Sequence, residues 1–157
     1  MQIWVDADAC PNVIKEVLFR AAQRVSIQLL LVANKPLRVP LSPFIRRIQV
    51  AGGFDVADNY IVEHIQVCDV LVTADIPLAA AALARGAYVL SFRGEVFNAD
   101  TIGERLVLRD LMETLRSGGI HTGGPAALSM GERQSFANQL DRLLVQHIKS
   151  TRTKHEP

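Results

Sequence analysis

Cysteine is scarce in this sequence, and long apolar runs do not occur in it. The two cysteines, Cys10 and Cys68, are neither spaced as a CxxC pair nor numerous enough for a disulfide scaffold. We expect both to be reduced, partly buried thiols. No apolar run reaches the ~18 residues needed to cross a bilayer, and the sequence opens on a strand-like segment instead of a targeting segment. A cytoplasmic protein without a membrane span is the expectation.

The sequence also has little net charge and few aromatic side chains. The formal net charge is only +1, and aromatic residues make up 6% of the chain. These values exclude a surface that is basic throughout, of the kind that binds nucleic acid without specificity. No ladder of aromatic residues marks a stacking platform for single strands. Any site for a polyanion such as RNA must therefore be local.

Segments of strand and helix type alternate along the first two thirds of the chain, which is typical of an α/β fold. Strands are predicted at residues 3–5, 27–32, 45–50, 69–73 and 88–90, and helices at 11–21, 55–66, 78–85, 101–116 and 129–148. The last two helices start with the spacing of a capping box, at Thr101 and Ser129. The pattern predicts one three-layer domain over residues 1–148, with a mainly parallel sheet of four or five strands flanked by helices. Residues 149–157 are polar and are predicted to form a flexible tail.

Aspartates follow two of the predicted buried strands. Asp6 and Asp8 come directly after the first strand, and Asp75 follows the strand at 69–73. If both strands are parallel members of one sheet, these carboxylates meet at the edge where open α/β sheets bind ligands. Converging carboxylates repel one another, and a hard cation such as Mg²⁺ or Mn²⁺ relieves that repulsion. The plainer alternative is that the aspartates cap helices, although one cap does not explain two carboxylates in the first motif.

Further polar residues are candidates for the same site. Asp58 falls in the first turn of the helix at 55–66, and we expect it to be an outer metal ligand, with Asp55 as the helix cap. Candidates for contact with a substrate phosphate are Asn34, Lys35, Arg38 and Thr73. Arg46, Arg47 and Arg93 would extend a basic patch, with a solvated surface as the plain alternative. The segment Thr122–Pro125 lacks the lysine of a phosphate-binding loop and is predicted to form a turn.

Five short motifs occur together in this chain. They are Val5–Pro11, Val32–Asn34, Gly53–Asp58, Thr73–Ala79 and Thr122–Pro125. On these motifs, which extend from the first strand to the final helix, the chain resembles the YaiI/YqxD family of uncharacterised bacterial proteins. That family is grouped by fold with the PIN-like nucleases, which are metal-dependent and mostly cut RNA. The resemblance implies a PIN-like fold, and it places the acidic positions of those nucleases on Asp6 with Asp8 beside it, on Asp58, and on Asp75 with Thr73.

The leading hypothesis is a divalent-metal-dependent phosphodiesterase or nuclease that acts on RNA. Asp6, Asp8 and Asp75 would be catalytic, and together with Asp58 they would bind one or two Mg²⁺ or Mn²⁺ ions. One alternative is a phosphatase of the haloacid-dehalogenase type with Asp6 as nucleophile and Asp8 as general acid, although Cys10 stands where such enzymes carry Thr or Val. Another is a metal- or RNA-binding module without catalysis. The sequence is compatible with a homodimer but marks no interface.

Overall fold

The computed structural model describes residues 1–119 and 127–155 of the chain. The strands in these residues are β1 (Ile3–Asp6), β2 (Leu29–Ala33), β3 (Ile45–Gln49), β4 (Val70–Val72), β5 (Tyr88–Leu90) and β6 (Val96–Phe97). The helices are α1 (Asn12–Val25), α2 (Val56–His64), α3 (Ile76–Ala84), α4 (Ala99–Ser117) and α5 (Met130–His155). The predicted α/β class is confirmed. None of the described helices combines the length and apolar character needed to cross a membrane.

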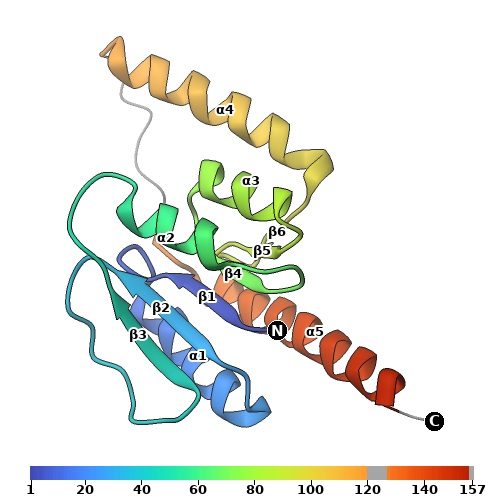
Figure 1. The fold of residues 1–157 in the computed structure, drawn as a ribbon. Helices are drawn as coiled ribbons and strands as arrows, with labels where there is room; N and C mark the ends of the chain where they lie inside the picture. The colour runs from blue at the N-terminus through green and yellow to red at the C-terminus, as the bar shows by residue number, and fades with distance from the viewer. Residues whose placement is uncertain (120–126, 156–157) are drawn as a thin grey trace.

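A single sheet with the strand order β3-β2-β1-β4-β5-β6 forms the middle layer (Figure 1). The strands β1 to β5 are parallel, and β6 runs antiparallel to β5. The described residues thus form six strands where four or five were predicted, because the two residues of β6 are too few to show a strand pattern. The chain goes from β1 outward through β2 and β3, and then returns to the other side of β1 for β4. The order therefore reverses between β1 and β4, and open α/β sheets bind ligands at such a switch point.

Apolar cores lie on both faces of the sheet. Helices α1 and α5 cover one face, where Ile14 and Leu140 are buried, and α2 and α3 cover the other, where Ile61 and Leu78 are buried. Helix α4 lies over α3, farther from the sheet (Figure 1). Every residue of β2 is buried, as is typical of a parallel strand with helices on both faces. The structure therefore has the predicted layers, with α4 added outside them.

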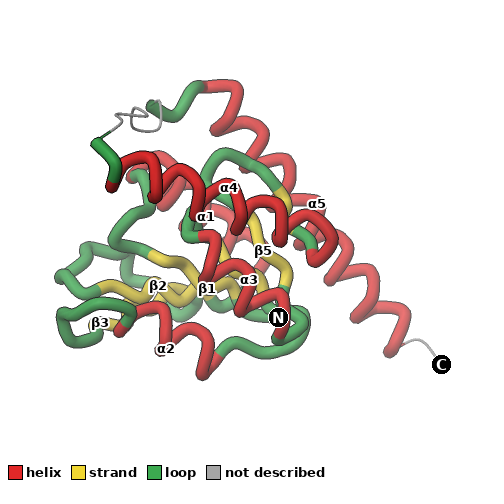
Figure 2. The backbone as a smooth tube through the Cα atoms, turned by 90° about the horizontal axis from the view of Figure 1, so that it is seen from above, coloured by secondary structure: helices red, strands yellow, loops and turns green. Residues whose placement is uncertain are grey.

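The final helix has the predicted start but a later end. Ser129 Oγ accepts a hydrogen bond from the backbone N–H of Glu132 at 3.0 Å, and Glu132 Oε1 accepts one from the backbone N–H of Ser129 at 3.1 Å, which is the predicted capping box. The helix continues through residues 149–155, which were predicted to be a flexible tail, because this segment contains no glycine or proline to end it. Helix α5 consequently extends beyond the sheet (Figures 1 and 2).

Helix α4 begins earlier than predicted and is largely exposed. Asn98 Oδ1 accepts a hydrogen bond from the backbone N–H of Thr101 at 2.9 Å, so Asn98 is the N-cap and Thr101 lies inside the helix. Leu108 and Leu111 are 52% and 54% exposed. Both leucines face water because α4 packs mainly on α3.

Candidate functional site

The carboxyl ends of β1 and β4 bring Asp6 and Asp75 to the switch point of the sheet. Val5 on β1 pairs with Val72 on β4, so the residues that follow them, Asp6 and Thr73, are neighbours. The buried hydroxyl of Thr73 donates a hydrogen bond to Asp6 Oδ2 at 3.0 Å, and it accepts one from the backbone N–H of Asp75 at 3.0 Å. Thr73 thus links the two aspartates.

Asp75 caps a helix and also belongs to the acidic site. Its Oδ1 accepts a hydrogen bond from the backbone N–H of Leu78 at 3.0 Å, at the start of α3. The capping interpretation is therefore correct for this oxygen. The negative charge of Asp75 nevertheless raises the pKa of both Asp6 and Asp58. The cap holds Asp75 in place beside the other carboxylates.

Asp8 joins the ends of β1 and β2. This exposed carboxylate accepts a hydrogen bond through Oδ2 from the backbone N–H of Asn34, at 2.7 Å. The side-chain Oδ1 of Asn34 is buried and has no hydrogen-bond partner among the described residues. An unpartnered buried amide oxygen costs free energy. It therefore marks a place beside Asp8 where a donor or a cation from outside the chain would be stabilised.

The aspartates form one electrostatic cluster. Burial raises the pKa of Asp6, and the negative charges of Asp75 and Asp8 raise it further. Burial, together with the charges of Asp75, Asp6 and Asp55, raises the pKa of Asp58 from 3.8 to about 6. Shifts of this kind arise where carboxylates repel one another in a partly desolvated place. The convergence predicted for the strand ends is therefore present, and it extends to α2 through Asp58.

The oxygen donors of this cluster suit a hydrated hard cation. Asp6, Asp8 and Asp75 each use one oxygen in a hydrogen bond, and the second oxygen of each accepts none from the part of the chain that is described. Within the described residues, however, no three His, Cys, Asp or Glu side chains are grouped closely enough to hold one metal ion. Mg²⁺ keeps several water ligands and takes only one or two carboxylates. The donor set therefore fits Mg²⁺ or Mn²⁺ bound partly through water, and it does not form a complete protein cage.

The predicted substrate contacts differ in how exposed they are. Asn34 and Lys35 lie at the end of β2 beside Asp8, and both Lys35 and Arg38 are exposed. Thr73 is completely buried, so its hydroxyl orients the aspartates and is not placed to contact a phosphate. Two of the four predicted contacts, Lys35 and Arg38, are therefore exposed to a substrate, and Asn34 is half-buried.

The arginines of the predicted basic patch differ in their surroundings. Arg46 is exposed on the edge strand β3. Arg47 donates a hydrogen bond to the backbone carbonyl of Leu37 at 2.8 Å and so holds the loop after β2. Arg93 pairs with Glu132 at the start of α5, with 2.8 Å between Nη1 and Oε1. These arginines do not form one patch. The predicted turn at Thr122–Pro125 lies outside the described residues.

One prediction near the site is right in position only, and one about a cysteine remote from the site was wrong. Asp55 occupies the N-cap position of α2, but its backbone is left-handed with a φ of 61° and its side chain makes no capping hydrogen bond. Cys68 was expected to be partly buried and is exposed. Cys10 is buried as expected, and burial raises the pKa of its thiol to about 12. Cys10 is therefore protonated at neutral pH and is a poor nucleophile.

Asp69, a buried carboxylate at the amino end of β4, was not among the predicted site residues. Asp69 accepts hydrogen bonds from the backbone N–H of Gln2 at 2.9 Å, from Trp4 Nε1 at 3.0 Å and from the backbone N–H of Gln66 at 3.0 Å. These donors satisfy the charge and tie the starts of β1 and β4 together. Its only signal in the sequence is an aspartate before an apolar strand, which is equally typical of a turn.

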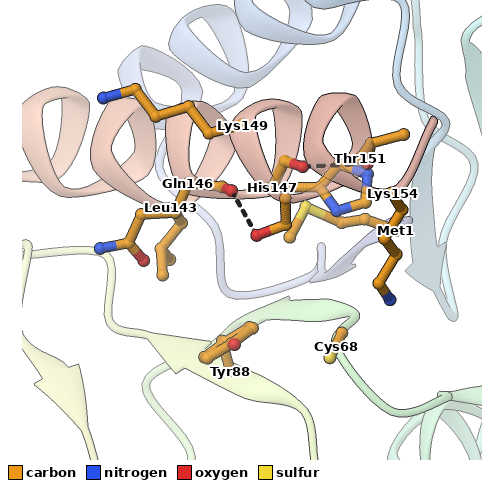
Figure 3. A pocket seen from close by; sticks show the side chains of 10 residues that line it. Met1, Cys68, Tyr88, Leu143, Gln146, His147, Lys149, Thr151 and Lys154 are labelled. Carbon is orange, nitrogen blue, oxygen red and sulfur yellow. Dashed lines mark hydrogen bonds between the residues drawn. The ribbon is translucent and has the colours of Figure 1, made fainter. Parts of the chain in front are cut away.

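A separate cleft of about 650 Å³ lies at the amino ends of the strands, opposite the aspartates. It separates the second half of α5 from the starts of β4 and β5, and its lining includes Met1, Cys68, Tyr88, His147 and Lys154 (Figure 3). Burial lowers the pKa of His147, and the positive charges of the amino terminus and of Lys154 lower it further. None of the predicted site residues lines this cleft.

The fold and the acidic edge together define the class: an α/β protein with a mainly parallel sheet whose switch point carries a cluster of aspartates. No solved structure matches the chain significantly. Residues 4–146 match the family described as "Uncharacterized BCR, YaiI/YqxD family", and the chain belongs to this family. The resemblance seen in the sequence motifs is thereby confirmed.

Relatives in this family are similar along almost their whole length. A UPF0178 protein of Saccharophagus degradans is 60% identical over 151 residues, which is 96% of this chain and 100% of the relative. A UPF0178 protein of Hahella chejuensis is 59% identical over 150 residues, with 96% and 100% covered. A UPF0178 protein of Bordetella petrii is 64% identical over 145 residues, with 92% and 97% covered. These names state a family and no activity.

Proposed function

We propose that this protein is a cytoplasmic, divalent-metal-dependent phosphodiesterase that acts on RNA. The observation that carries the proposal is the link through Thr73 between Asp6 and Asp75 at the switch point of the sheet. The raised pKa of Asp6 and of Asp58 supports it, because a cation would remove the repulsion that causes these shifts. The resemblance of the family to PIN-like nucleases supports the choice of RNA as substrate.

The residues of the site would divide the work by position. When bound, Mg²⁺ or Mn²⁺ would lower the pKa of a water molecule and neutralise charge on the phosphate. Asp6 and Asp75 offer one oxygen each from neighbouring strand ends, and Asp8 offers one from beside β2. Asp58, with a pKa of about 6, can hold or release a proton near neutral pH. The buried Oδ1 of Asn34 can accept a hydrogen bond from a water molecule beside Asp8.

The direct test is cleavage of labelled single-stranded and structured RNA in Mg²⁺ or Mn²⁺, with EDTA as the metal-free control. We expect Asp6→Asn and Asp75→Asn to lower the rate about 100-fold or more, as loss of transition-state charge stabilisation does. The amide oxygen of Asn can still accept the hydrogen bonds from Thr73 and Leu78, so both variants should fold. The matched control is Asp110→Asn, an exposed carboxylate on α4. Full activity of Asp75→Asn, or no cleavage by the wild type, would contradict the proposal.

The same assays separate the two alternatives. A phosphatase of the haloacid-dehalogenase type would turn over a small phosphomonoester and form a transient acyl phosphate on Asp6. A binding module would retain RNA without cleaving it, whichever metal is supplied. Either result would replace the phosphodiesterase proposal while leaving the acidic site as the place of binding.

A further inference from the structure

A cleft of about 330 Å³ lies beside the acidic edge, between the first turns of α1 and the loop after β2. It is lined by Asn12, Lys15, Glu16, Phe19, Pro36, Leu37 and Arg38. The hydrogen bond from the backbone N–H of Asn34 to Asp8 Oδ2 joins its two walls, because the chain runs from Asp8 into α1 and from Asn34 into the loop. The two walls of the cleft therefore meet near Asp8, although Asp8 itself does not line the cleft.

The loop wall of this cleft is held in place. Leu37 and Val39, on either side of Arg38, pack against the apolar core beneath α1. The carbonyl of Leu37 also accepts the hydrogen bond from Arg47 on β3, and Pro36 and Pro40 restrict the backbone. Arg38 is thus presented by a preformed segment, so a ligand need not first order it.

The cleft combines cationic groups with an apolar surface. None of the ion pairs in the described part of the chain involves Lys15 or Arg38. Lys15 lies in the first turn of α1 and is half-buried. Glu16 is the only carboxylate in the lining, so the cationic groups outnumber it. Phe19 lies one helical turn beyond Lys15 and provides the aromatic surface.

We propose that this cleft holds one unpaired nucleotide of a single-stranded RNA, with its phosphate at Lys15 and Arg38 and its base against Phe19. The inference rests on the proposed function and adds the substrate class. A volume of about 330 Å³ is at the lower end of ligand pockets and suits one nucleotide. Lysine and arginine neutralise the phosphate, and an aromatic side chain stacks on a base of any sequence. A base inside a duplex cannot enter, so the strand must be unpaired here.

The test measures binding without catalysis. A fluorescein-labelled short oligouridylate is titrated with protein in EDTA over a range of salt concentrations, and anisotropy reports the affinity. Replacing two phosphate contacts, Lys15→Gln with Arg38→Gln, should reduce the slope of log affinity against log salt by about 1.4. This corresponds to roughly 25-fold weaker binding at 0.1 M salt. Arg20→Gln is the matched control, since Arg20 is exposed on the same helix and outside this cleft.

Two further variants test the role of the aromatic surface and the preference of the cleft for a negatively charged ligand. Phe19→Leu should weaken binding about tenfold without changing the salt slope, since stacking is not an ionic contact. Glu16→Gln should strengthen binding, because it removes the one negative charge of the lining. Thermal unfolding of each variant shows whether it is folded.

The outcomes separate this inference from the proposed function. If the double variant binds and cleaves like the wild type, the subsite is wrong and the phosphodiesterase proposal stands. A duplex that binds as tightly as the single strand would also overturn the subsite. If the wild type cleaves no RNA but binds the oligouridylate through Lys15 and Arg38, the subsite is supported and the phosphodiesterase proposal is rejected. If the wild type neither binds nor cleaves, both fail.

Discussion

The hydroxyl of Thr73 at the end of β4 donates a hydrogen bond to the carboxylate of Asp6 at the end of β1, at 3.0 Å. The same oxygen accepts the backbone N–H of Asp75. A completely buried threonine therefore positions two aspartates that are far apart in the sequence. This arrangement gives Thr73 a physical role, which is to hold the carboxylates in place.

Thr73→Val should change the titration of Asp6. The hydrogen bond from Thr73 lowers the pKa of Asp6, so its loss should raise that pKa further and move the acid limb of metal-dependent activity to higher pH. The free energy of unfolding should fall by about 1–3 kcal/mol, because buried polar groups lose a partner. NMR titration of the Asp6 carboxyl carbon and urea unfolding measure both effects. Thr73→Ser keeps the hydroxyl and is the control; an unchanged Asp6 titration in Thr73→Val would contradict this role.

Asp58 should destabilise the fold at neutral pH. Its pKa in the folded protein is about 6, above the ordinary 3.8, so the folded state binds a proton that the unfolded state has released. The free energy of unfolding therefore falls as the pH rises from about 4 to about 6, and it loses no more through Asp58 above that range. Asp58→Asn should raise the free energy of unfolding by about 1 kcal/mol at neutral pH, a small value because water screens a partly exposed carboxylate. Urea unfolding on both sides of this pH range measures it, and equal gains at both ends would count against the assignment.

Mg²⁺ should offset the loss of stability that ionised Asp58 causes. A cation that binds the ionised cluster stabilises the folded protein, and it does so more above the pKa of Asp58 than below it. We expect Mg²⁺ to raise the melting temperature of the wild type at neutral pH and to raise that of Asp58→Asn less. Asp110→Asn should respond like the wild type. A Mg²⁺ effect that does not depend on pH or on Asp58 would place the ion elsewhere.

Asp69→Asn should loosen the amino ends of β1 and β4. Asn can accept hydrogen bonds through one oxygen only, whereas Asp69 accepts three through two oxygens. Loss of a charge-assisted bond to Trp4 Nε1 should lower the free energy of unfolding by about 1–3 kcal/mol. Trp4 is the only tryptophan of the chain, so its fluorescence reports this contact directly. Emission and stability equal to those of the wild type would show that the contact contributes nothing.

Ser129→Ala should weaken the start of α5. The side chain of Ser129 accepts the N–H of Glu132, and such a cap is worth about 1 kcal/mol. The hydrogen bond from Arg93 and that from the Ser129 backbone lower the pKa of Glu132, so the stabilisation from Glu132 is lost as the pH falls through its folded-state value. Thermal unfolding at neutral and acid pH measures both. Ser150→Ala, on the same helix, is the control, and a loss as large there would remove the capping explanation.

The sequence by itself determined the features that depend on neighbouring residues. Apolar periodicity marked the strands and helices of the parallel sheet, and the spacing of Ser129 and Glu132 marked the start of α5. The aspartates at the ends of β1 and β4 were predicted to meet because parallel strands end at one edge, whatever the packing around them.

Only the tertiary structure decided the features that join distant segments. It paired Thr73 with Asp6 and Asp69 with Trp4, and it formed the cleft between α1 and the loop after β2. It also added β6, whose two residues are held by pairing with β5 and carry no period of their own. A hydrogen bond or a cleft between segments depends on their register and on burial, and these quantities are set by the packed fold as a whole and not by any local pattern.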